Sequence, residues 1–541
     1  MLSRGNSYDE ICQAFRWEIP ARFNIATAVC ERHARETPDR PALIVHHDSG
    51  DPDVVSFEQL DRLCNRLANL FIARGLTRGD RVGILLPQTP ETAIAHIAAY
   101  KAGLIAIPLS TLFRADALEY RLANSAARAL VTDRAGLDLL ADIRGALTDL
   151  TIVLSADGPG DGADDLHGEM QRASDQFSIV DTAADDPAFI SFTSGTTGPP
   201  KGALHAHRSL LGHLPGVQFP HEFFPQSGDL FWTPADWAWL GGLMDVLMPS
   251  LYFGIPVLCY RATKFDPAEA FHLMAKHRVR NTFIPPTALK MMRQVSDPNR
   301  HWDFALRTLG SGGESLGSEL LGWGEETFDL TINEFYGQTE CNLVIGNCAA
   351  VMPVRPGSMG RAIPGHDVAI VDAAGDPVPS GTAGSIGIRK DDPVSFLGYW
   401  QDDAATTEKF AGDWLLTGDV GTRDADGYFW FVGRDDDVIT SAGYRIGPGE
   451  IEDCLMRHPA VALAGVVGVP DAMRTEIIKA CLVLRDGVVA DEMLEQSIQD
   501  FVRRRLAAHE YPRLIEFRDA LPMTTTGKIM RRKLRIPATD A

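Results

Sequence analysis

The chain lacks the sequence signals of secretion and of membrane insertion. Its first twenty residues contain no apolar run of signal-peptide length and carry three acidic side chains, which disfavours a secretory signal or a transit peptide. No run of about 18 apolar residues is present to span a bilayer. The longest near-candidate, residues 240–260, is interrupted by Asp245, Pro249 and Pro256, and we expect it to form a buried helix followed by a strand. We therefore predict a cytoplasmic protein without stable membrane insertion.

Positive charge and metal-spaced cysteines are also scarce. Lys and Arg number 51 against 72 Asp and Glu, so the net charge is −21. This balance argues against nucleic acid as a main partner, because phosphate backbones require a basic face. A small anionic ligand is still compatible, since one local basic site suffices to bind it. The eight cysteines show no metal-ligand spacing, and Cys341 and Cys348 are interpreted as packing residues, which favours a reducing compartment.

The length and the hydrophobic pattern predict the fold class. At 541 residues the chain is too long for one ordinary core. Apolar residues recur at helical spacing from residue 56 to residue 76, with Ser56 as the expected N-cap, and short apolar strands then alternate with helices. Such alternation is typical of βαβ units on a parallel sheet. After about residue 355 the sequence becomes turn-rich, with short alternating strands that predict a β-subdomain.

The predicted architecture is α/β with two domains. Residues 1–433 are expected to form a large N-terminal domain of doubly wound α/β layers plus the β-subdomain. Residues 434–541 are expected to form a small, mobile C-terminal α+β domain of ordinary size for a separate unit.

Residues 189–205, "FISFTSGTTGPPKGALH", contain the strongest local signal. A segment rich in Gly, Ser and Thr with one lysine is typical of phosphate binding, because backbone N–H groups can close on an anion while Lys supplies charge. The common G-x-x-x-x-G-K-[ST] spacing does not fit, because Pro200 precedes Lys201 and Gly202 follows it. His205 and His207 flank the loop without a third metal ligand, and we interpret them as structural.

Six motifs occur in order along the chain: "FTSGTTGPPKG", "SGGESL", "YGQTE", "LLTGD", "GRDDDVITSAGYRIGPGEIE" and "PMTTTGKIMR". Their sequence and spacing resemble the adenylate-forming, acyl- and aryl-activating enzyme superfamily, and most of all its medium-chain acyl-CoA synthetases. The resemblance implies an enzyme that uses ATP, CoA and Mg²⁺ to activate a carboxylic acid. The acid would attack the α-phosphorus of ATP to give an acyl-adenylate and pyrophosphate, and CoA would then take the acyl group.

The resemblance also assigns roles in the first step. Lys528 would be the catalytic lysine, Thr339 would contact the α-phosphate or the acyl carboxylate, and Glu340 would hold Mg²⁺ together with the ATP phosphates. Tyr336 would stack on adenine, and Asp419 would take both ribose hydroxyls. The residues expected to bind ATP are Thr193, Ser194, Gly195, Thr196, Thr197, Gly198, Lys201, Gly313, Glu314, Glu334, Phe335, Tyr336, Gly337, Gln338, Thr339, Asp419, Arg434 and Lys528.

For the second step the resemblance implies rotation of the small domain about a hinge at Asp436. Arg445 is expected to be catalytic at the thiol face. The residues expected to meet CoA are Ala442, Gly443, Tyr444, Arg445, Arg474, Arg503 and Arg513. Arginine suits this task because its planar fork matches phosphate oxygens.

The acyl pocket is expected to be lined by Trp237, Trp239, Leu240, Gly241, Gly312 and Gly337. The acetate-specific members of the superfamily that this chain resembles carry a bulky Trp where this chain has Gly337, so the glycine is expected to enlarge the pocket. We therefore expect a medium-chain, branched or aryl acid, since each buried methylene contributes about 0.8 kcal/mol.

Three alternatives remain open. A stand-alone adenylation enzyme that loads a carrier-protein thiol would share every ATP motif and differ only at the thiol face. An oxygenase of the luciferase type has no positive support. A catalytically dead nucleotide-binding subunit is disfavoured because Lys201, Thr339, Glu340, Asp419, Arg434 and Lys528 are all present together. The expected oligomeric state is a monomer or a homodimer.

Overall fold

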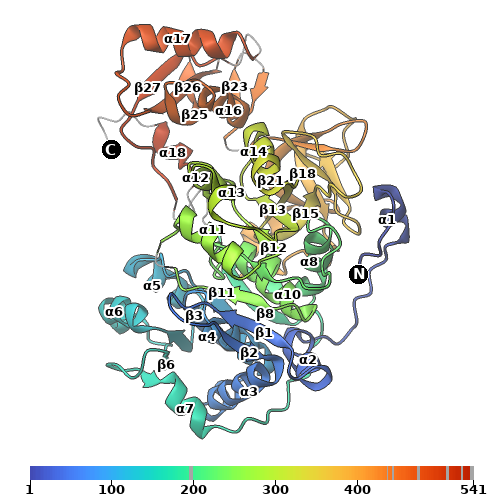
Figure 1. Cartoon of the computed structure of the whole chain (residues 1–541), viewed down its shortest axis with the longest axis vertical. Coiled ribbons are helices and arrows are strands. Elements are labelled where there is room, and N and C mark those ends of the chain that lie inside the picture. The colour runs from blue at the N-terminus through green and yellow to red at the C-terminus, as the bar shows by residue number, and fades with distance from the viewer. Residues whose placement is uncertain are drawn as a thin grey trace. The chain divides into compact units, whose positions relative to one another are not determined.

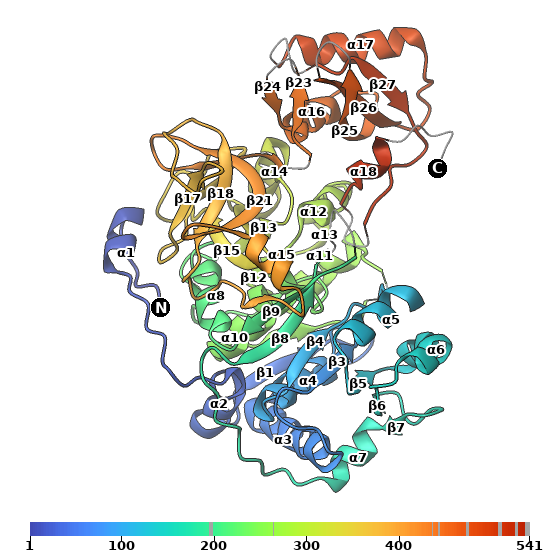
Figure 2. The same ribbon diagram turned by 180° about the vertical axis from the view of Figure 1, so that it is seen from behind.

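The computed structural model divides into two compact units. It describes every residue except 194–198, 263, 435–436, 442–443, 472–474, 507–510, 525–527 and 536–541. The first unit comprises Met1–Pro356, Gly360–Asp367 and Arg389–Phe410, and the second comprises Gly357–Met359, Val368–Ile388 and Ala411–Ala541. Figures 1 and 2 label their elements. Each unit is described by itself.

The first unit contains an eight-stranded sheet in the order β19-β9-β8-β4-β3-β5-β6-β7. Its strands β3, β4, β5, β6 and β8 pair in parallel, whereas β9 is antiparallel to β8 and to β19. The bounds are β3 Arg81–Leu85, β4 Ile105–Pro108, β5 Ala129–Thr132, β6 Ile152–Ser155, β7 Asp164–Asp165, β8 Pro187–Phe192, β9 Gly202–Ala206 and β19 Gly398–Tyr399.

Helices cover both faces of this sheet, since β4 is buried along its whole length. Helix α4 packs against β3 and β4, and α3 packs on α4. Helices α5 and α6 contribute Leu118, Leu122 and Leu140 to the core that contains Ile105 and Ile107 of β4. The helix bounds are α3 Phe57–Ala73, α4 Pro90–Lys101, α5 Ala115–Asn124, α6 Arg134–Ile143 with η2 Arg144–Ala146, and α7 Leu166–Arg172.

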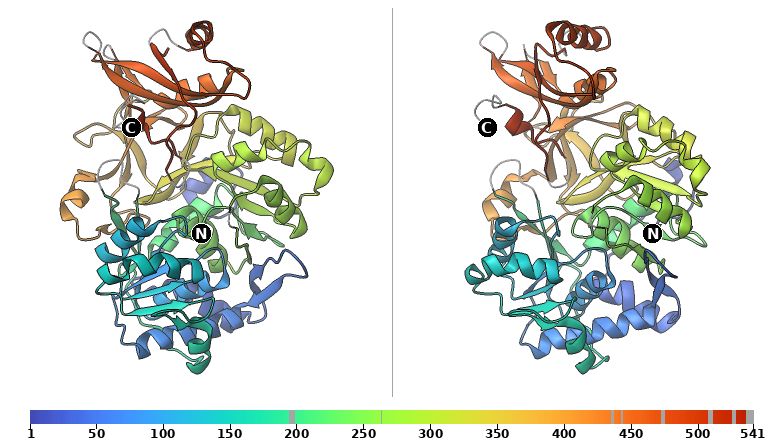
Figure 3. Two further views of the ribbon diagram at one scale, coloured as in Figure 1. Left: turned by 90° about the vertical axis from the view of Figure 1, so that its left-hand side faces the viewer. Right: turned by 60° about the vertical axis from the view of Figure 1, so that its left-hand side comes forward.

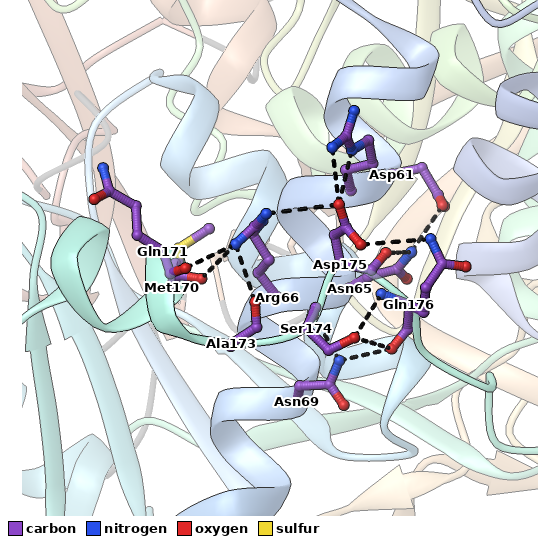
Figure 4. Close-up of polar contacts among 11 residues, drawn as sticks. Asp61, Asn65, Arg66, Asn69, Met170, Gln171, Ala173, Ser174, Asp175 and Gln176 are labelled. Carbon is purple, nitrogen blue, oxygen red and sulfur yellow. Dashed lines mark hydrogen bonds and ion pairs between the residues drawn. The ribbon is translucent and has the colours of Figure 1, made fainter.

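Helix α3 begins as the sequence predicts and anchors a distant connection. Ser56 forms a capping box with Gln59 at its N-terminus. Its polar face then binds the segment after α7: Arg66 donates to the carbonyls of Met170, Gln171 and Ala173, Asn69 donates to those of Ser174 and Gln176, and Arg62 and Arg66 form ion pairs with Asp175 (Figure 4). Residues 173–182 form neither a helix nor a strand. The bonds from α3 to their backbone carbonyls therefore hold this segment in place.

The second sheet of the first unit runs β16-β15-β14-β13-β12-β10-β11-β1-β2. Strands β10 to β14 pair in parallel, and β15 and β16 continue antiparallel. The bounds are β1 Pro41–Val45, β2 Asp53–Ser56, β10 Phe231–Trp232, β11 Val257–Cys259, β12 Asn281–Phe283, β13 Thr308–Gly312, β14 Asn333–Gln338, β15 Cys341–Gly346 and β16 Ser358–Ala362. Helices α11, α12 and α14 pack on it through Phe271, Leu289 and Leu320.

The remaining elements of the first unit are mostly short helices. They are α1 Tyr8–Ala14, η1 Thr27–Glu31, α2 Arg32–Glu36, α8 Ser209–Gln218, α9 Leu240–Gly242, η3 Leu243–Leu247, α10 Met248–Tyr252, α11 Pro267–Lys276, α12 Pro286–Met292, α13 Pro298–His301, α14 Ser318–Phe328 and α15 Asp403–Glu408. The apolar segment 240–260 therefore forms buried helix followed by β11, as predicted. Within the described part of the chain, no helix is long and apolar enough to cross a membrane.

The second unit contains an antiparallel β-subdomain and an α+β part (Figure 3). The subdomain strands are β17 Val368–Val371, β18 Gly384–Arg389, β20 Phe410–Ala411, β21 Trp414–Arg423 and β22 Phe429–Arg434. The α+β part has a sheet in the order β24-β23-β26-β25, with β27 beside β26, and helices α16 and α17 share its core through Leu455 and Ile498. The bounds are β23 Ile439–Ser441, β24 Tyr444–Ile446, α16 Pro448–Met456, β25 Val461–Asp471, β26 Thr475–Leu484, α17 Glu492–Arg503, β27 Leu514–Phe517 and α18 Arg531–Leu534.

These elements confirm the predicted fold class, with doubly wound α/β layers, a β-subdomain and a small α+β part. The domain boundary between residues 433 and 434 and the mobility of the C-terminal part stay predictions.

Candidate active site

The Gly-rich segment connects β8 to β9, which pair antiparallel and form a hairpin. The N–H and the hydroxyl of Thr193 donate to the carbonyl of Lys201, at 2.9 Å and 3.3 Å, and so close the base of the hairpin. On α5, Tyr120 Oη donates to the Pro200 carbonyl at 3.0 Å. Ser194, Gly195, Thr196, Thr197 and Gly198 lie outside the described residues. The two ends of the predicted phosphate loop are thus fixed, with Lys201 at one of them.

Glu340 lies in the turn between β14 and β15 and is only 6% exposed. Its Oε1 accepts a hydrogen bond from Tyr399 Oη at 2.5 Å, and its backbone carbonyl accepts from the Phe396 N–H at 3.0 Å. Its Oε2 has no hydrogen-bond partner among the residues that the structure describes. A buried carboxylate with one oxygen held and the other open fits a site for Mg²⁺, which prefers one or two carboxylates plus phosphate oxygens.

Tyr399 connects this carboxylate to the phosphate loop. It lies on β19, opposite Ala203 of β9, and the Lys201 ammonium is 5.3 Å from the centre of its ring. One tyrosine therefore orients Glu340 through its hydroxyl and contacts Lys201 through its ring face. The sequence analysis missed Tyr399, because it lies about 200 positions after Lys201 in a turn-rich stretch that carries no pattern of its own.

Parallel strands β13 and β14 bring the predicted adenine residues to one edge. Gly312 pairs with Phe335 and Ser311 pairs with Glu334, so residues 313–314, which follow β13, and residues 336–340, at the end of β14 and in the turn after it, lie at the carboxyl ends of neighbouring strands. Ligands of open α/β sheets bind at such ends. Gly313 has φ +92°, which a residue with a side chain adopts only with strain, and the space in front of it is open. Both oxygens of Glu314 accept from Thr287 Oγ1, at 3.1 Å and 3.0 Å, which fixes this carboxylate beside the edge.

In the second unit, Asp419 on β21 pairs in register with Arg434 on β22. Their side chains form an ion pair of 3.2 Å, and Asp419 is 5% exposed. Asp419, predicted to bind the ribose hydroxyls, is thus adjacent to Arg434, a second predicted ATP-binding residue. Lys528 is exposed; its N–H donates to Thr524 Oγ1 at 3.1 Å, and its carbonyl accepts from the Thr524 N–H at 2.8 Å.

Comparison with known proteins decides the family. The AMP-binding enzyme family matches residues 30–400, and the family of the AMP-binding enzyme C-terminal domain matches residues 450–528. The chain is 34% identical to the mitochondrial acyl-coenzyme A synthetase ACSM3 of Mus musculus, over 98% of this chain and 93% of that protein.

This protein is an AMP-binding enzyme. The predicted membership of the adenylate-forming superfamily is therefore confirmed. Among solved structures, the anthranilate CoA ligase AuaEII in complex with anthranoyl-AMP is similar, with a TM-score of 0.86 and 28% identity over 96% of this chain and 97% of that one. A benzoate CoA ligase from Burkholderia xenovorans LB400 has a TM-score of 0.84 and 27% identity over 95% of this chain and 100% of that one.

Two of the arginines that this AMP-binding enzyme was predicted to use for CoA lie on one aromatic ring. The guanidinium of Arg503 is 4.3 Å and that of Arg513 is 4.9 Å from the centre of the Tyr511 ring. Arg503 also pairs with Asp500 at 2.8 Å. The predicted residues Asp436, Ala442, Gly443 and Arg474, and the side chains of Tyr444 and Arg445, lie outside the described part of the chain.

The pocket glycines leave less room than the sequence analysis expected. A Cβ at Gly241 would stand 2.7 Å from the Phe283 ring, one at Gly312 would stand 2.6 Å from the Phe335 ring, and one at Gly337 would stand 2.7 Å from Asn342 Oδ1. These three neighbours occupy the volume that side chains at the glycines would take; Phe335 was predicted as an ATP-binding residue, whereas no sequence pattern pointed to Phe283 or Asn342. Phe283 and Phe335 also pack on each other, with ring centres 5.3 Å apart.

Two of the other predicted wall residues are buried, and Trp239 is half-buried. Trp237 is 1% exposed, Leu240 is 7% exposed, and Trp239 packs against the Phe113 ring at 5.7 Å.

The two histidines beside the phosphate loop have the structural character that was predicted. His205 stacks on Phe189 at 4.6 Å, and burial lowers its pKa to about 3. His207 Nδ1 accepts from the Ile25 N–H at 3.2 Å, and burial lowers its pKa to about 4. Both imidazoles are therefore neutral at physiological pH.

Proposed function

We propose that this AMP-binding enzyme is an AMP-forming acyl-CoA synthetase for a medium-chain, branched or aryl carboxylic acid. The observation that carries the proposal is the arrangement of Lys201, Tyr399 and Glu340 at the base of the Gly-rich hairpin. It combines a fixed cation at a phosphate loop with a buried carboxylate that has one open oxygen. The similarity to acyl- and aryl-CoA ligases along nearly the whole chain supports the same class.

In the first step a carboxylate oxygen of the acid forms a bond to the α-phosphorus of ATP. The bond from that phosphorus to the bridging oxygen breaks, and pyrophosphate leaves. Two anions must approach each other, so most of the catalysis is charge neutralisation and positioning. Lys201 and the hairpin would hold the β- and γ-phosphates, and Lys528 would neutralise charge on the reacting oxygens. Asp419 would accept hydrogen bonds from the ribose hydroxyls while Arg434 holds its carboxylate in place.

Glu340 would hold Mg²⁺ through Oε2, with Tyr399 fixing the other oxygen. The ion, when bound, neutralises phosphate charge. No group of three or more His, Cys, Asp or Glu side chains able to hold a metal occurs among the described residues, which agrees with a site completed by the nucleotide.

In the second step the CoA thiolate attacks the acyl carbonyl carbon, the thioester bond forms, and AMP leaves with both electrons of the broken C–O bond. Arg503 and Arg513, both against Tyr511, would bind CoA phosphates. Rotation of the small domain about Asp436 would remove Lys528 from the reacting atoms and bring the CoA-binding residues to them.

The proposal is tested by product identification. The protein is incubated with ATP, Mg²⁺, CoA and a panel of carboxylic acids, and AMP and acyl-CoA are measured by mass spectrometry. Stoichiometric AMP and acyl-CoA are expected with at least one acid. Acyl-adenylate that accumulates without acyl-CoA would instead support the alternative, an adenylation enzyme that loads a carrier-protein thiol.

We further propose a cytoplasmic monomer or homodimer. All eight cysteines are free thiols, which fits a reducing compartment. Cell fractionation tests the cytoplasmic location, and recovery of the protein in an organelle would contradict it. Light scattering tests the monomeric or homodimeric state.

A further inference from the structure

A buried polar pair lies at the wall of the predicted acyl pocket. Asp245 is in the π-helical turn η3 and is 3% exposed, and Asn342 is on β15 and is 7% exposed. Asn342 Nδ2 donates to Asp245 Oδ1 at 2.5 Å. Single π-helical turns are frequent at functional sites.

The pair lies beside one of the predicted pocket glycines and on the same helical segment as another. Asn342 Oδ1 is 2.7 Å from the place of a Cβ on Gly337, so this amide fills the space in front of that glycine. Asp245 follows Gly241 by four residues on one continuous helical segment, α9 and η3. The polar pair therefore belongs to the same wall as Gly241 and Gly337.

The hydrogen-bonding capacity of this pair is only half used. Asp245 Oδ2 and Asn342 Oδ1 have no hydrogen-bond partner, and no Lys or Arg forms an ion pair with Asp245, among the residues that the structure describes. Burial raises the pKa of Asp245 well above its usual range, which favours the protonated carboxyl, a form that offers both an O–H donor and an acceptor.

The indole N–H of Trp237 is a second unpartnered buried donor in the same chain segment, within the described residues. A pocket that receives only a hydrocarbon chain would leave all of these groups unsatisfied. An acyl group with a polar substituent would satisfy at least one of them.

We propose that Asp245 and Asn342 select an acid whose acyl group carries a hydroxyl or amino substituent away from its carboxylate. This inference rests on the proposed function and names the substrate class of that same pocket. Sites built to hydrogen-bond a substrate group discriminate strongly against the analogue that lacks it, because their own polar groups are then left unpaired.

Matched acids test the inference. 3-Phenylpropanoate is compared with its 4-hydroxy and 4-amino derivatives, and hexanoate with 6-hydroxyhexanoate, and kcat/KM is measured for each from pyrophosphate release. We expect the substituted acid to be preferred about 10- to 100-fold in at least one series, the discrimination that one hydrogen bond supplies. Asp245→Leu should reduce that ratio to about 1. Met244→Leu, a volume-conserving change at the neighbouring buried position, should leave the ratio as in the wild type.

Equal or better use of the unsubstituted acid in every series would overturn the inference while leaving the proposed function intact. A ratio that survives Asp245→Leu would overturn it as well. The comparison of acids with the wild-type enzyme can refute the inference by itself, even if the Asp245→Leu variant does not fold. Absence of pyrophosphate release with any acid would overturn the proposed function, and this inference with it.

Discussion

Replacing Tyr399 by phenylalanine removes one hydroxyl and leaves the ring under Lys201. The lost interaction is the 2.5 Å hydrogen bond to Glu340, a carboxylate that is 6% exposed and has no other partner for that oxygen among the described residues. Hydrogen bonds to charged groups contribute about 1.5–3 kcal/mol, which corresponds to roughly 10- to 150-fold in an equilibrium or rate constant. Because Glu340 is the proposed Mg²⁺ carboxylate, we expect this loss to appear mainly in the metal dependence of adenylation.

The assay is acid-dependent pyrophosphate release at a series of Mg²⁺ concentrations. Tyr399→Phe should need about 10-fold or more Mg²⁺ for half-maximal rate and should lose kcat/KM for ATP at low Mg²⁺. Tyr260→Phe is the matched control, since the Tyr260 hydroxyl makes no hydrogen bond within the described residues. If Tyr399→Phe folds and shows the wild-type Mg²⁺ dependence, Tyr399 does not orient Glu340 for the metal and the reasoning fails.

Three further predictions concern charge. Lys528→Ala should slow adenylation about 100-fold or more, whereas a supplied acyl-adenylate should still be converted with CoA; equal loss of both half-reactions would contradict its role. Asp419→Asn should raise KM for ATP about 10-fold, since the carboxylate paired with Arg434 is proposed to accept the ribose hydroxyls, and an ATP titration with unchanged KM would remove that assignment. Burial lowers the pKa of His96 and His205 to about 3, against about 6.5 in an unfolded chain, so the unfolded state binds more protons at acid pH. The contribution of these histidines to the free energy of unfolding should therefore be fully present above pH ~6.5. It should fall as the pH drops, by up to about 1.4 kcal/mol per pH unit per histidine, and a melting temperature that stays constant from pH 7 to pH 5 would contradict this prediction.

Local chemistry explains what the sequence predicted correctly. Ser56 before an amphipathic run marks the start of α3, and alternating apolar strands and helices mark the parallel layers, because capping and periodicity act over a few residues. The site at the ends of β13 and β14 could be predicted for the same reason, because the motifs that end these two strands contain Gly and Glu residues that are recognisable in the sequence.

Contacts between distant segments explain what the sequence did not predict. Tyr399 contacts Glu340 and Lys201 because β19 pairs with β9. A strand of two residues is too short to carry a sequence pattern that would predict this pairing. The pocket glycines likewise suggested open volume, but Phe283 and Asn342 come from other strands and occupy it. Side chains that fill a neighbour's space can be found only once the register of the sheet is known.

The measurement that tests the proposed chemistry most directly is pyrophosphate release against a panel of carboxylic acids, with and without CoA. We predict release that depends on the acid, and that is sustained over many turnovers only when CoA is present. Release that is independent of any acid, or no release with every acid and CoA, would contradict an acyl-CoA synthetase.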